Sequence, residues 1–293
     1  QAFTYVFNRE TGEPLWPIVE RPVPQSNAPG EQSSPTQPFP TKPKAFDYQG
    51  YSEDILADFT PEIKAEALKA VQRYNLGPIF TPPILKDAGG KEGTFQLPGA
   101  GGGANWMGAA ADLETGYFYI PSVTSAYISS LVPGGTRSEM PYIGGGSLGG
   151  IPNPGGVPLI KPPYGRITAL DLGKGTLAWQ IPHGDTPDEI RNHPALKGLT
   201  IPRTGRQGRV GVLTTKTLVI AGEGSMATTP TGKRGAMLRA YDKKTGADIG
   251  AVYLPAPQTG SPMTFALDGT QYLTVAISAP NFGAELLTFK VGN

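Results

Sequence analysis

Thr168-Ala-Leu-Asp171-Leu-Gly-Lys-Gly175-Thr-Leu-Ala-Trp179 is the stretch that decides the fold. It predicts a short apolar strand, a turn that opens with Asp and closes with Gly, and a second strand that carries Trp. The Asp side chain can accept hydrogen bonds within its own turn, and Gly can supply the positive φ that the turn needs. We expect the Trp to pack against a neighbouring unit of the same kind.

The same pattern occurs in two more places. Tyr5-Val-Phe-Asn8-Arg-Glu-Thr-Gly12-Glu-Pro-Leu-Trp16 precedes it, and Arg239-Ala-Tyr-Asp242-Lys-Lys-Thr-Gly246-Ala-Asp-Ile-Gly250 follows it. In the last copy Gly250 stands where the others have Trp, so we expect the packing contact to be lost there. A strand–turn–strand unit that recurs along a chain predicts an array of small antiparallel sheets.

Short β-branched and aromatic runs extend this all-β pattern. The turn Asp112-Leu-Glu-Thr-Gly116 leads directly into Tyr117-Phe-Tyr-Ile120, which predicts another hairpin. Asp268-Gly269 is a strong hairpin signal between two further runs. Strands are predicted at residues 217–222, 263–267, 272–277 and 286–290.

Two long segments interrupt the strand pattern. Residues 22–95 form an insertion, and its Pro-rich part, residues 22–43, is expected to run extended over the surface. Residues 133–163 are rich in Gly and Pro and almost uncharged. We expect this second loop to be ordered only where other parts of the protein pack on it.

One helix is predicted inside the insertion, at about residues 61–75. Thr60 is a good N-cap, and Pro61 suits the first helical position. Gly77 can close the helix. Its apolar face is predicted to consist of Ile63, Ala67, Val71 and Tyr74.

The composition excludes several classes of protein and of site. A formal net charge of +1, without a run of Lys or Arg, argues against nucleic acid as the main partner. The absence of Cys excludes disulfides, thiolate metal sites and a Cys nucleophile. Because His183 and His193 are the only histidines, a multi-His metal site is impossible.

The longer motifs resemble those of dehydrogenases that bind pyrroloquinoline quinone (PQQ). Residues 3–18, which contain the first repeat, are similar to the middle of membrane-type glucose dehydrogenases and their soluble relatives. So are Gly102-Gly-Ala-Asn-Trp106, Leu238-Arg-Ala-Tyr-Asp242 and Gly260-Ser-Pro-Met-Thr264, in the order that the family has them. The resemblance runs through the whole chain but corresponds only to the second half of such an enzyme.

This resemblance implies that residues 1–293 form the C-terminal half, about four blades, of an eight-bladed β-propeller. In the family the quinone lies on the propeller axis with a Ca²⁺ ion beside it. The catalytic Asp and the Ca²⁺ ligands come from the first half, so no catalytic residue and no metal ligand is expected in this chain. The chain would then be active only together with an N-terminal half, present as a separate or cleaved chain.

The resemblance also implies the setting in which such an enzyme works. The substrate would be a small alcohol or sugar, and the electrons would pass to a cytochrome or to ubiquinone. The family is periplasmic, either soluble or attached to the membrane through another segment.

The first candidate for the quinone site is Gly99-Ala-Gly-Gly-Gly-Ala-Asn-Trp106. Its glycines would let the backbone approach a planar ligand closely. Asn105 is predicted to hydrogen-bond a quinone oxygen or carboxylate, and Trp106 to line the channel. The alternative is a tight loop whose Trp packs between blades.

The second candidate is Gly205-Arg-Gln-Gly-Arg-Val-Gly211, which passes near the cofactor in the family. Arg209 is predicted to pair with a carboxylate of the quinone, since a guanidinium group binds carboxylates in a bidentate fork. Gly211 is assigned to the same cofactor-binding segment, and Arg206 is a weaker candidate. The alternative is a solvated basic loop.

The third candidate is the loop Ala279-Pro-Asn-Phe-Gly283, which in relatives lies over the mouth of the active site. Asn281 and Phe282 are predicted to meet substrate there. The alternative is an ordinary turn between two strands.

Two departures from the family pattern leave other classes of function open. Relatives carry a quinone-binding Asn after the strand that matches Tyr117–Ile120, where this chain has Pro121-Ser122. They also carry an Asp before the strand that matches residues 238–241, where this chain has the insertion 228–235. Both argue against glucose as the substrate. The alternatives are a non-catalytic propeller scaffold and a sugar-binding module that uses Trp106.

Overall fold

The computed structural model describes residues 1–145 and 151–292. The chain forms two compact units, each assembled from separate segments of the sequence. The first unit consists of residues 1–103, 124–161 and 193–197, without the undescribed positions. The remaining described residues form the second unit.

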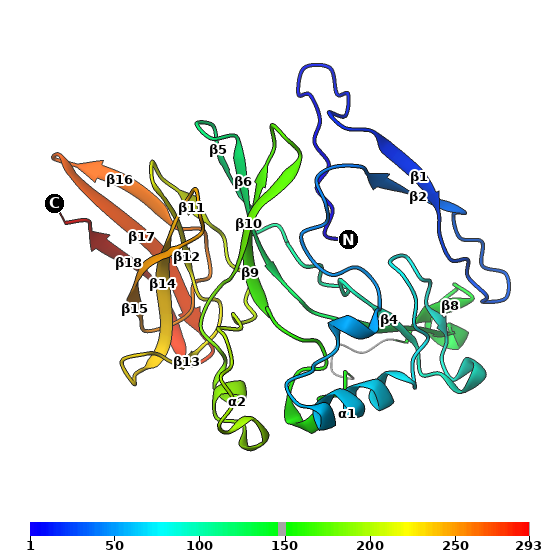
Figure 1. Ribbon diagram of the computed structural model, residues 1–293. Helices are drawn as coiled ribbons and strands as arrows, with labels where there is room; N and C mark the ends of the chain where they lie inside the picture. The colour runs from blue at the N-terminus through cyan, green and yellow to red at the C-terminus, as the bar shows by residue number, and fades with distance from the viewer. Residues whose placement is uncertain (146–150, 293) are drawn as a thin grey trace. The chain divides into compact units, whose positions relative to one another are not determined.

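Three antiparallel sheets, which follow one another along the chain, make up the second unit (Figure 1). The first sheet has the order β10-β9-β6-β5, and its strands are β5 (Ala110–Asp112), β6 (Tyr117–Val123), β9 (Gly165–Asp171) and β10 (Thr176–Pro182). The second sheet has the order β11-β12-β14-β15, and its strands are β11 (Leu213–Thr214), β12 (Leu218–Gly222), β14 (Arg234–Asp242) and β15 (Asp248–Leu254), with β13 (Ala227–Thr228) also paired to β14. The third sheet has the order β16-β17-β18, and its strands are β16 (Met263–Leu267), β17 (Thr270–Ala279) and β18 (Phe282–Lys290).

These sheets confirm the predicted all-β architecture. The strands expected from residue 217 to residue 290 are found as β12, β16, β17 and β18. Asp268 and Gly269 form the predicted hairpin turn with φ of +49° and +73°, the left-handed values that a two-residue turn between twisted strands requires. Among the described residues, three sheets of blade type lie in the second unit, and the other strands belong to the first unit.

The repeat turns have the predicted geometry. Asp171 Oδ1 accepts hydrogen bonds from the backbone N–H groups of Gly173 and Lys174, both at 3.0 Å. Gly175 closes the turn with a φ of +66°. The equivalent turns open with Asn8, Asp112 and Asp242 and close with Gly12, Gly116 and Gly246 at φ of +75°, +71° and +74°. One local rule therefore sets the hairpins of both units.

The first unit combines one helix with two small sheets. The hairpin of β1 (Ile18–Pro22) and β2 (Thr36–Pro40) forms one sheet. The other consists of β3 (Ile84–Leu85), β4 (Thr94–Gln96), β7 (Tyr127–Pro133) and β8 (Tyr142–Gly144). The helices are α1 (Pro61–Val71), in this unit, and α2 (Asp188–Arg191), in the second unit. In the described parts of the chain, no helix has the length and apolar character needed to cross a membrane.

Helix α1 begins as predicted. Thr60 Oγ1 accepts a hydrogen bond from the backbone N–H of Ile63 at 3.3 Å, and Pro61 is the first helical residue. This cap satisfies one of the N–H groups that a helix start leaves without a partner. The predicted apolar face is buried, with exposed fractions of at most 3 % at Ile63, Ala67, Val71 and Tyr74.

The end of α1 differs from the prediction. The helix stops at Val71 rather than near residue 75. Asn75 instead joins the backbone of the following strand: its N–H donates to the Gly93 carbonyl at 2.8 Å, and its carbonyl accepts from Phe95 at 3.0 Å. These bonds to β4 end the helix before Gly77 can close it.

The two interrupting segments are more ordered than their composition suggests. Residues 22–43 contain β2, which pairs with β1, so part of this extended stretch is hydrogen-bonded into a sheet. Residues 133–163 contain β8 and supply Leu159 to the core around α1. Residues 146–150 of that segment lie outside the described residues.

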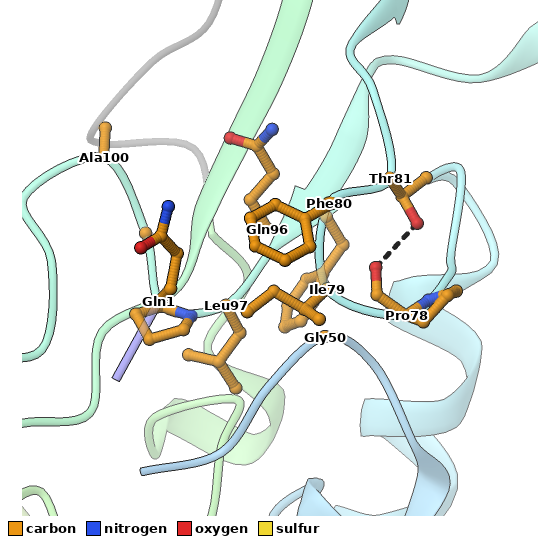
Figure 2. A pocket seen from close by; sticks show the side chains of 12 residues that line it. Gln1, Gly50, Pro78, Ile79, Phe80, Thr81, Gln96, Leu97 and Ala100 are labelled. Atoms are coloured by element: carbon orange, nitrogen blue, oxygen red, sulfur yellow. Dashed lines mark hydrogen bonds between the residues drawn. The ribbon is translucent and has the colours of Figure 1, made fainter. Parts of the chain in front are cut away.

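A cavity of about 180 Å³ opens in the first unit (Figure 2). Phe80 and Leu97 supply apolar walls, and Gln1 and Gln96 supply neutral amides. Among the described residues, its lining includes no ionisable side chain and none of the predicted site residues. The cavity therefore offers no side chain for general acid–base catalysis.

Candidate functional site

Three segments lead directly into the first strand of each sheet in the second unit. Residues 104–109 precede β5, residues 205–212 precede β11 and residues 257–262 precede β16. We call these the lead-in segments. Ser261 Oγ donates a hydrogen bond to the Met107 carbonyl at 3.2 Å, which joins the first segment to the third.

The second lead-in segment meets the other two at Gly211. A Cβ atom on Gly211 would lie 2.0 Å from Ser261 Oγ and 2.9 Å from the Met107 carbonyl oxygen. Only Gly fits there, because any side chain would collide with both neighbouring segments. The structure thus brings the Asn105–Trp106 and Arg209–Gly211 candidates into one place, which we call the lead-in junction.

Asn105 shapes the first lead-in segment. Its Oδ1 accepts a hydrogen bond from the backbone N–H of Trp106 at 2.7 Å, and its carbonyl accepts one from Gly108 at 3.2 Å. These bonds fold residues 105–108 into a tight turn. The Trp106 side chain is 85 % exposed, so it does not pack between the sheets of this unit. An exposed indole on a fixed turn is available to a ligand.

The two arginines of the second lead-in segment have opposite environments. The Arg206 side chain is 3 % exposed and forms an ion pair with Glu223 at 3.3 Å. Arg209 is exposed and has no hydrogen-bond or ion-pair partner among the described residues. Arg209 is therefore the guanidinium that remains available to a carboxylate, and Arg206 holds the segment in place.

Glu223 lies at the centre of a buried charged group that sequence reasoning missed. Besides Arg206, its carboxylate accepts a hydrogen bond from Arg239 Nε at 2.8 Å. Arg239 in turn pairs with Asp185 at 2.9 Å. A signal was present in the sequence, since Gly222-Glu-Gly224 places a charged residue directly after an apolar strand. Such a residue needs buried partners.

His183 lies beside this group as a neutral, fully hydrogen-bonded side chain. Its Nε2 donates to the Gly222 carbonyl at 3.0 Å, so its Nδ1 accepts from the Tyr241 hydroxyl at 3.0 Å. Burial disfavours the imidazolium form and lowers the pKa of His183 to about 4, although Glu223 opposes that shift. The histidine is therefore a structural element rather than a base at neutral pH.

The third candidate loop is a tight turn. Pro280 and Asn281 connect β17 to β18, and Phe282 is already the first residue of β18. The backbone N–H of Ser278 donates to the Pro257 carbonyl at 3.1 Å, which places this turn at the lead-in end of the third sheet. Asn281 is exposed, whereas Phe282 packs partly against apolar residues of the third sheet. Their contact with substrate stays a prediction.

The two departures from the family pattern have clear structural consequences. Ser122 lies within β6, is 5 % exposed, and its hydroxyl has no hydrogen-bond partner among the described residues. The insertion 228–235 extends β14 to Arg234 and forms a short hairpin with β13. Asp188 anchors this hairpin, accepting from the Thr228 N–H at 2.9 Å.

The part of the chain that the structure describes holds no group of three or more His, Asp or Glu side chains able to bind a metal ion. The lead-in junction offers the exposed Trp106 ring and the Arg209 guanidinium, the kinds of group that contact aromatic rings and carboxylates.

Residues 1–273 match the PQQ-type model of the glucose/ethanol/alcohol dehydrogenase β-propeller domain. The chain belongs to this family. The repeat turns and their Gly residues are therefore features of a quinoprotein propeller.

Several curated quinoproteins are similar over almost the whole of this propeller chain. The quinate/shikimate dehydrogenase (quinone) of Acinetobacter baylyi is 25 % identical over 98 % of the chain, and this match covers 37 % of the relative. The glycerol dehydrogenase large subunit of Gluconobacter thailandicus is 28 % identical, with coverages of 95 % and 39 %. The quinoprotein glucose dehydrogenase of Escherichia coli is 28 % identical, with coverages of 96 % and 35 %. The chain thus spans little more than a third of the length of these relatives.

A solved structure, the quinohemoprotein alcohol dehydrogenase from Comamonas testosteroni, is similar over 74 % of this chain and 30 % of its own. The two are 19 % identical, with a TM-score of 0.44.

Proposed function

We propose that this chain forms one wall of the quinone site in a PQQ-dependent dehydrogenase that oxidises an alcohol or sugar hydroxyl. Family membership supports the class of chemistry. The observation that carries the proposal for this chain is the lead-in junction, where Trp106 is 85 % exposed and Arg209 is unpaired among the described residues.

The junction suits the shape and charge of PQQ, a planar aromatic quinone that bears carboxylates. Trp106 offers a flat apolar surface on which an aromatic ring system can stack. Arg209 offers a bidentate fork for a carboxylate. Gly211 keeps the backbone of the second lead-in segment close to Met107 and Ser261 of the other two segments.

When it is bound, the quinone supplies the oxidant that takes up the electron pair lost by the hydroxyl-bearing carbon. The residues of this chain bind and orient. Arg209 holds a cofactor carboxylate, Trp106 shields one face from water, and Asn105 fixes the turn that presents Trp106. We assign no base to this chain, and we place the catalytic Asp and the Ca²⁺ ligands in another part of the enzyme.

The free edge of the third sheet is the structural argument for a partner segment that completes the propeller. The first and second sheets each have four strands in their main path, whereas the third ends at β18, which pairs only with β17 among the described residues. Leu286 on β18 is 73 % exposed. A free, apolar edge strand favours pairing with a further strand. The relatives are nearly three times as long as this chain, so they have residues from which such a strand can come.

The proposal also covers the substrate and the electron acceptor. The relatives are named for quinate, shikimate, glycerol and glucose, all of which carry alcohol hydroxyls. We propose a small alcohol or sugar as the substrate, with Asn281 and Phe282 beside its channel. The electrons would pass to a cytochrome or to ubiquinone, and the enzyme would work in the periplasm.

The test is a PQQ titration of the protein in its native assembly after removal of the quinone, followed by absorbance. Loss of a charged hydrogen-bond partner in Arg209→Ala should weaken binding by roughly 10- to 100-fold. Trp106→Ala should weaken it by roughly tenfold through lost stacking. The matched controls are Arg9→Ala and Leu113→Ala, which remove an exposed Arg and an exposed apolar side chain from repeat turns.

Native mass spectrometry of the same sample separates the alternatives. A second polypeptide together with a released mass of PQQ agrees with the proposal. A protein that carries no quinone and takes up none would contradict it and favour the scaffold, an outcome consistent with the altered positions Pro121-Ser122 and 228–235. Tight sugar binding without quinone would favour the binding module.

A further inference from the structure

The side-chain amide of Gln258 hydrogen-bonds across the contact between the third and second sheets. It is 2 % exposed and lies in the third lead-in segment. Its Nε2 donates to the Gly211 carbonyl at 2.8 Å, and its Oε1 accepts from the Gly222 N–H at 2.5 Å. Its own backbone N–H donates to the Glu223 carbonyl at 3.0 Å. Gln258 thus ties the third lead-in segment to the second lead-in segment at Gly211 and to the end of β12 at Gly222 and Glu223.

Every neighbour of Arg209 is fixed by such contacts. A Cβ on Gly208 would lie 2.5 Å from Gly224 Cα, so two backbones meet there without side chains between them. Val210 is 5 % exposed, in the interior of the unit. Gly211 is held by Gln258 at its carbonyl. Arg209 is therefore an exposed side chain on a backbone that has little freedom.

We propose that Gln258 is a positioning residue for the quinone site, which acts by fixing the backbone at Gly211 and so the direction of the Arg209 guanidinium. The inference rests on the proposed function, because it assumes that Arg209 binds a quinone carboxylate. Gln258 itself does not touch the cofactor. A pre-oriented guanidinium loses less conformational freedom on binding, and it therefore binds its carboxylate more tightly.

The chemistry of an amide explains why Gln suits this position. The buried Gly211 carbonyl needs a donor and the Gly222 N–H needs an acceptor, and a side-chain amide supplies both. Glu at this position would keep the acceptor for Gly222 but would lose the donor for Gly211. Met would have a similar length and would supply neither.

The experiment is a double-mutant cycle on PQQ affinity, measured by titration of the quinone-free protein in its native assembly. Gln258→Met should raise the Kd for PQQ by roughly tenfold in the wild-type background. In the Arg209→Ala background the same substitution should change the Kd less than twofold, because the group that it positions is absent. Gln258→Glu also loses the donor to Gly211, so its loss of affinity should show the same dependence on Arg209. It serves as a second variant where Gln258→Met does not fold.

Two further measurements distinguish positioning from a general loss of stability. The Gly222 amide should lose hydrogen-exchange protection in Gln258→Met but keep it in Gln258→Glu. The matched control is Gln271→Ala in the same sheet, whose Nε2 donates to Thr264 Oγ1 at 2.9 Å on the exposed surface. This control should leave the Kd for PQQ unchanged.

The results distinguish failure of the positioning role of Gln258 from failure of the proposed function. Equal losses of affinity from Gln258→Met with and without Arg209 would overturn the positioning role, while the proposed function would stand. Failure of the wild-type protein to bind PQQ would overturn both. A loss that depends on Arg209 in both Gln258 variants would support the inference.

Discussion

The second unit has two interfaces between neighbouring sheets, which we call seams. Different side-chain contacts hold the two seams together. The seam between the first and second sheets contains an apolar cluster that includes Ile167 and Val219. Polar contacts add to this packing: Trp179 Nε1 and the Tyr119 hydroxyl both donate to the Lys243 carbonyl, at 3.2 and 3.0 Å. Lys243 Nζ pairs with Asp112 at 2.8 Å. The seam between the second and third sheets is mainly apolar and includes Leu254 and Ile277, which are fully buried.

The repeat motif accounts for this difference. In the first sheet, Trp179 stands after the repeat turn and reaches the turn 242–246 of the second sheet. In the second sheet, Gly250 occupies the corresponding place, and a Cβ there would meet nothing within 4 Å. Where the Trp is lost, aliphatic packing and the Gln258 amide join the sheets instead. Both seams thus contain apolar packing, and the first adds one large residue that also hydrogen-bonds across it.

The largest expected effect is at Trp179. Trp179→Ala should lower the free energy of unfolding by about 3–5 kcal/mol, since it removes a large buried side chain and leaves a cavity in the seam. The Lys243 carbonyl would also lose one of its two donors. Urea denaturation followed by circular dichroism would measure the change.

The control is Trp16→Ala, which removes the repeat Trp of the first unit, where the side chain is only half-buried. We expect a clearly smaller loss there. Equal losses at the two positions would mean that the seam contact of Trp179 adds nothing, and the contrast between the seams would fail.

A second prediction concerns pH, because His183 also joins the first seam through Tyr241 and Gly222. The folded protein holds the pKa of His183 near 4, and the unfolded chain has an ordinary value of about 6.5. Between these values the unfolded state binds the extra proton, so stability is complete above pH 6.5 and falls as the pH drops. The loss should reach about 3 kcal/mol at pH 4.

The groups that face His183 set the size of this effect. Burial is the main cause of the lowered pKa. The hydrogen bond with the Gly222 backbone and the charge of Glu223 raise the pKa, and Arg239 and Arg203 lower it. Denaturation curves at several pH values should show a steep loss for the wild type and a shallower one for His183→Gln. Identical slopes between pH 6.5 and 4 would show that His183 does not control the acid sensitivity of the seam.

Local chemistry made much of the fold predictable from the sequence. The Asp–Gly turns, the Asp268-Gly269 hairpin and the capped start of α1 depend on neighbours in the chain, and all three are found as expected. The end of α1 was not predictable, because Asn75 leaves the helix to pair with a strand that lies some twenty residues further on.

The candidate site was predictable only in part, for the same reason. The resemblance pointed to Asn105, Trp106, Arg209 and Gly211, and the structure brings their two segments together. The contact between Gly211 and Ser261 joins different sheets, and no local pattern encodes it. The different burial of Arg206 and Arg209 likewise depends on Glu223, which comes from the next strand connection.

The smallest effect tests whether the Trp contact, rather than the turn alone, defines the first seam. Gly246 and Gly12 close equivalent turns with φ of +74° and +75°. Ala at either position should cost about 1 kcal/mol for the left-handed backbone. At Gly246 the new Cβ would also lie 2.8 Å from the Trp179 ring, whereas at Gly12 it would meet nothing within 4 Å. Gly246→Ala should therefore cost about 1 kcal/mol more. In a Trp179→Ala background most of that excess should disappear, leaving only the contact with Ile181 at 3.1 Å. An undiminished excess there would place the strain in the turn instead of the seam.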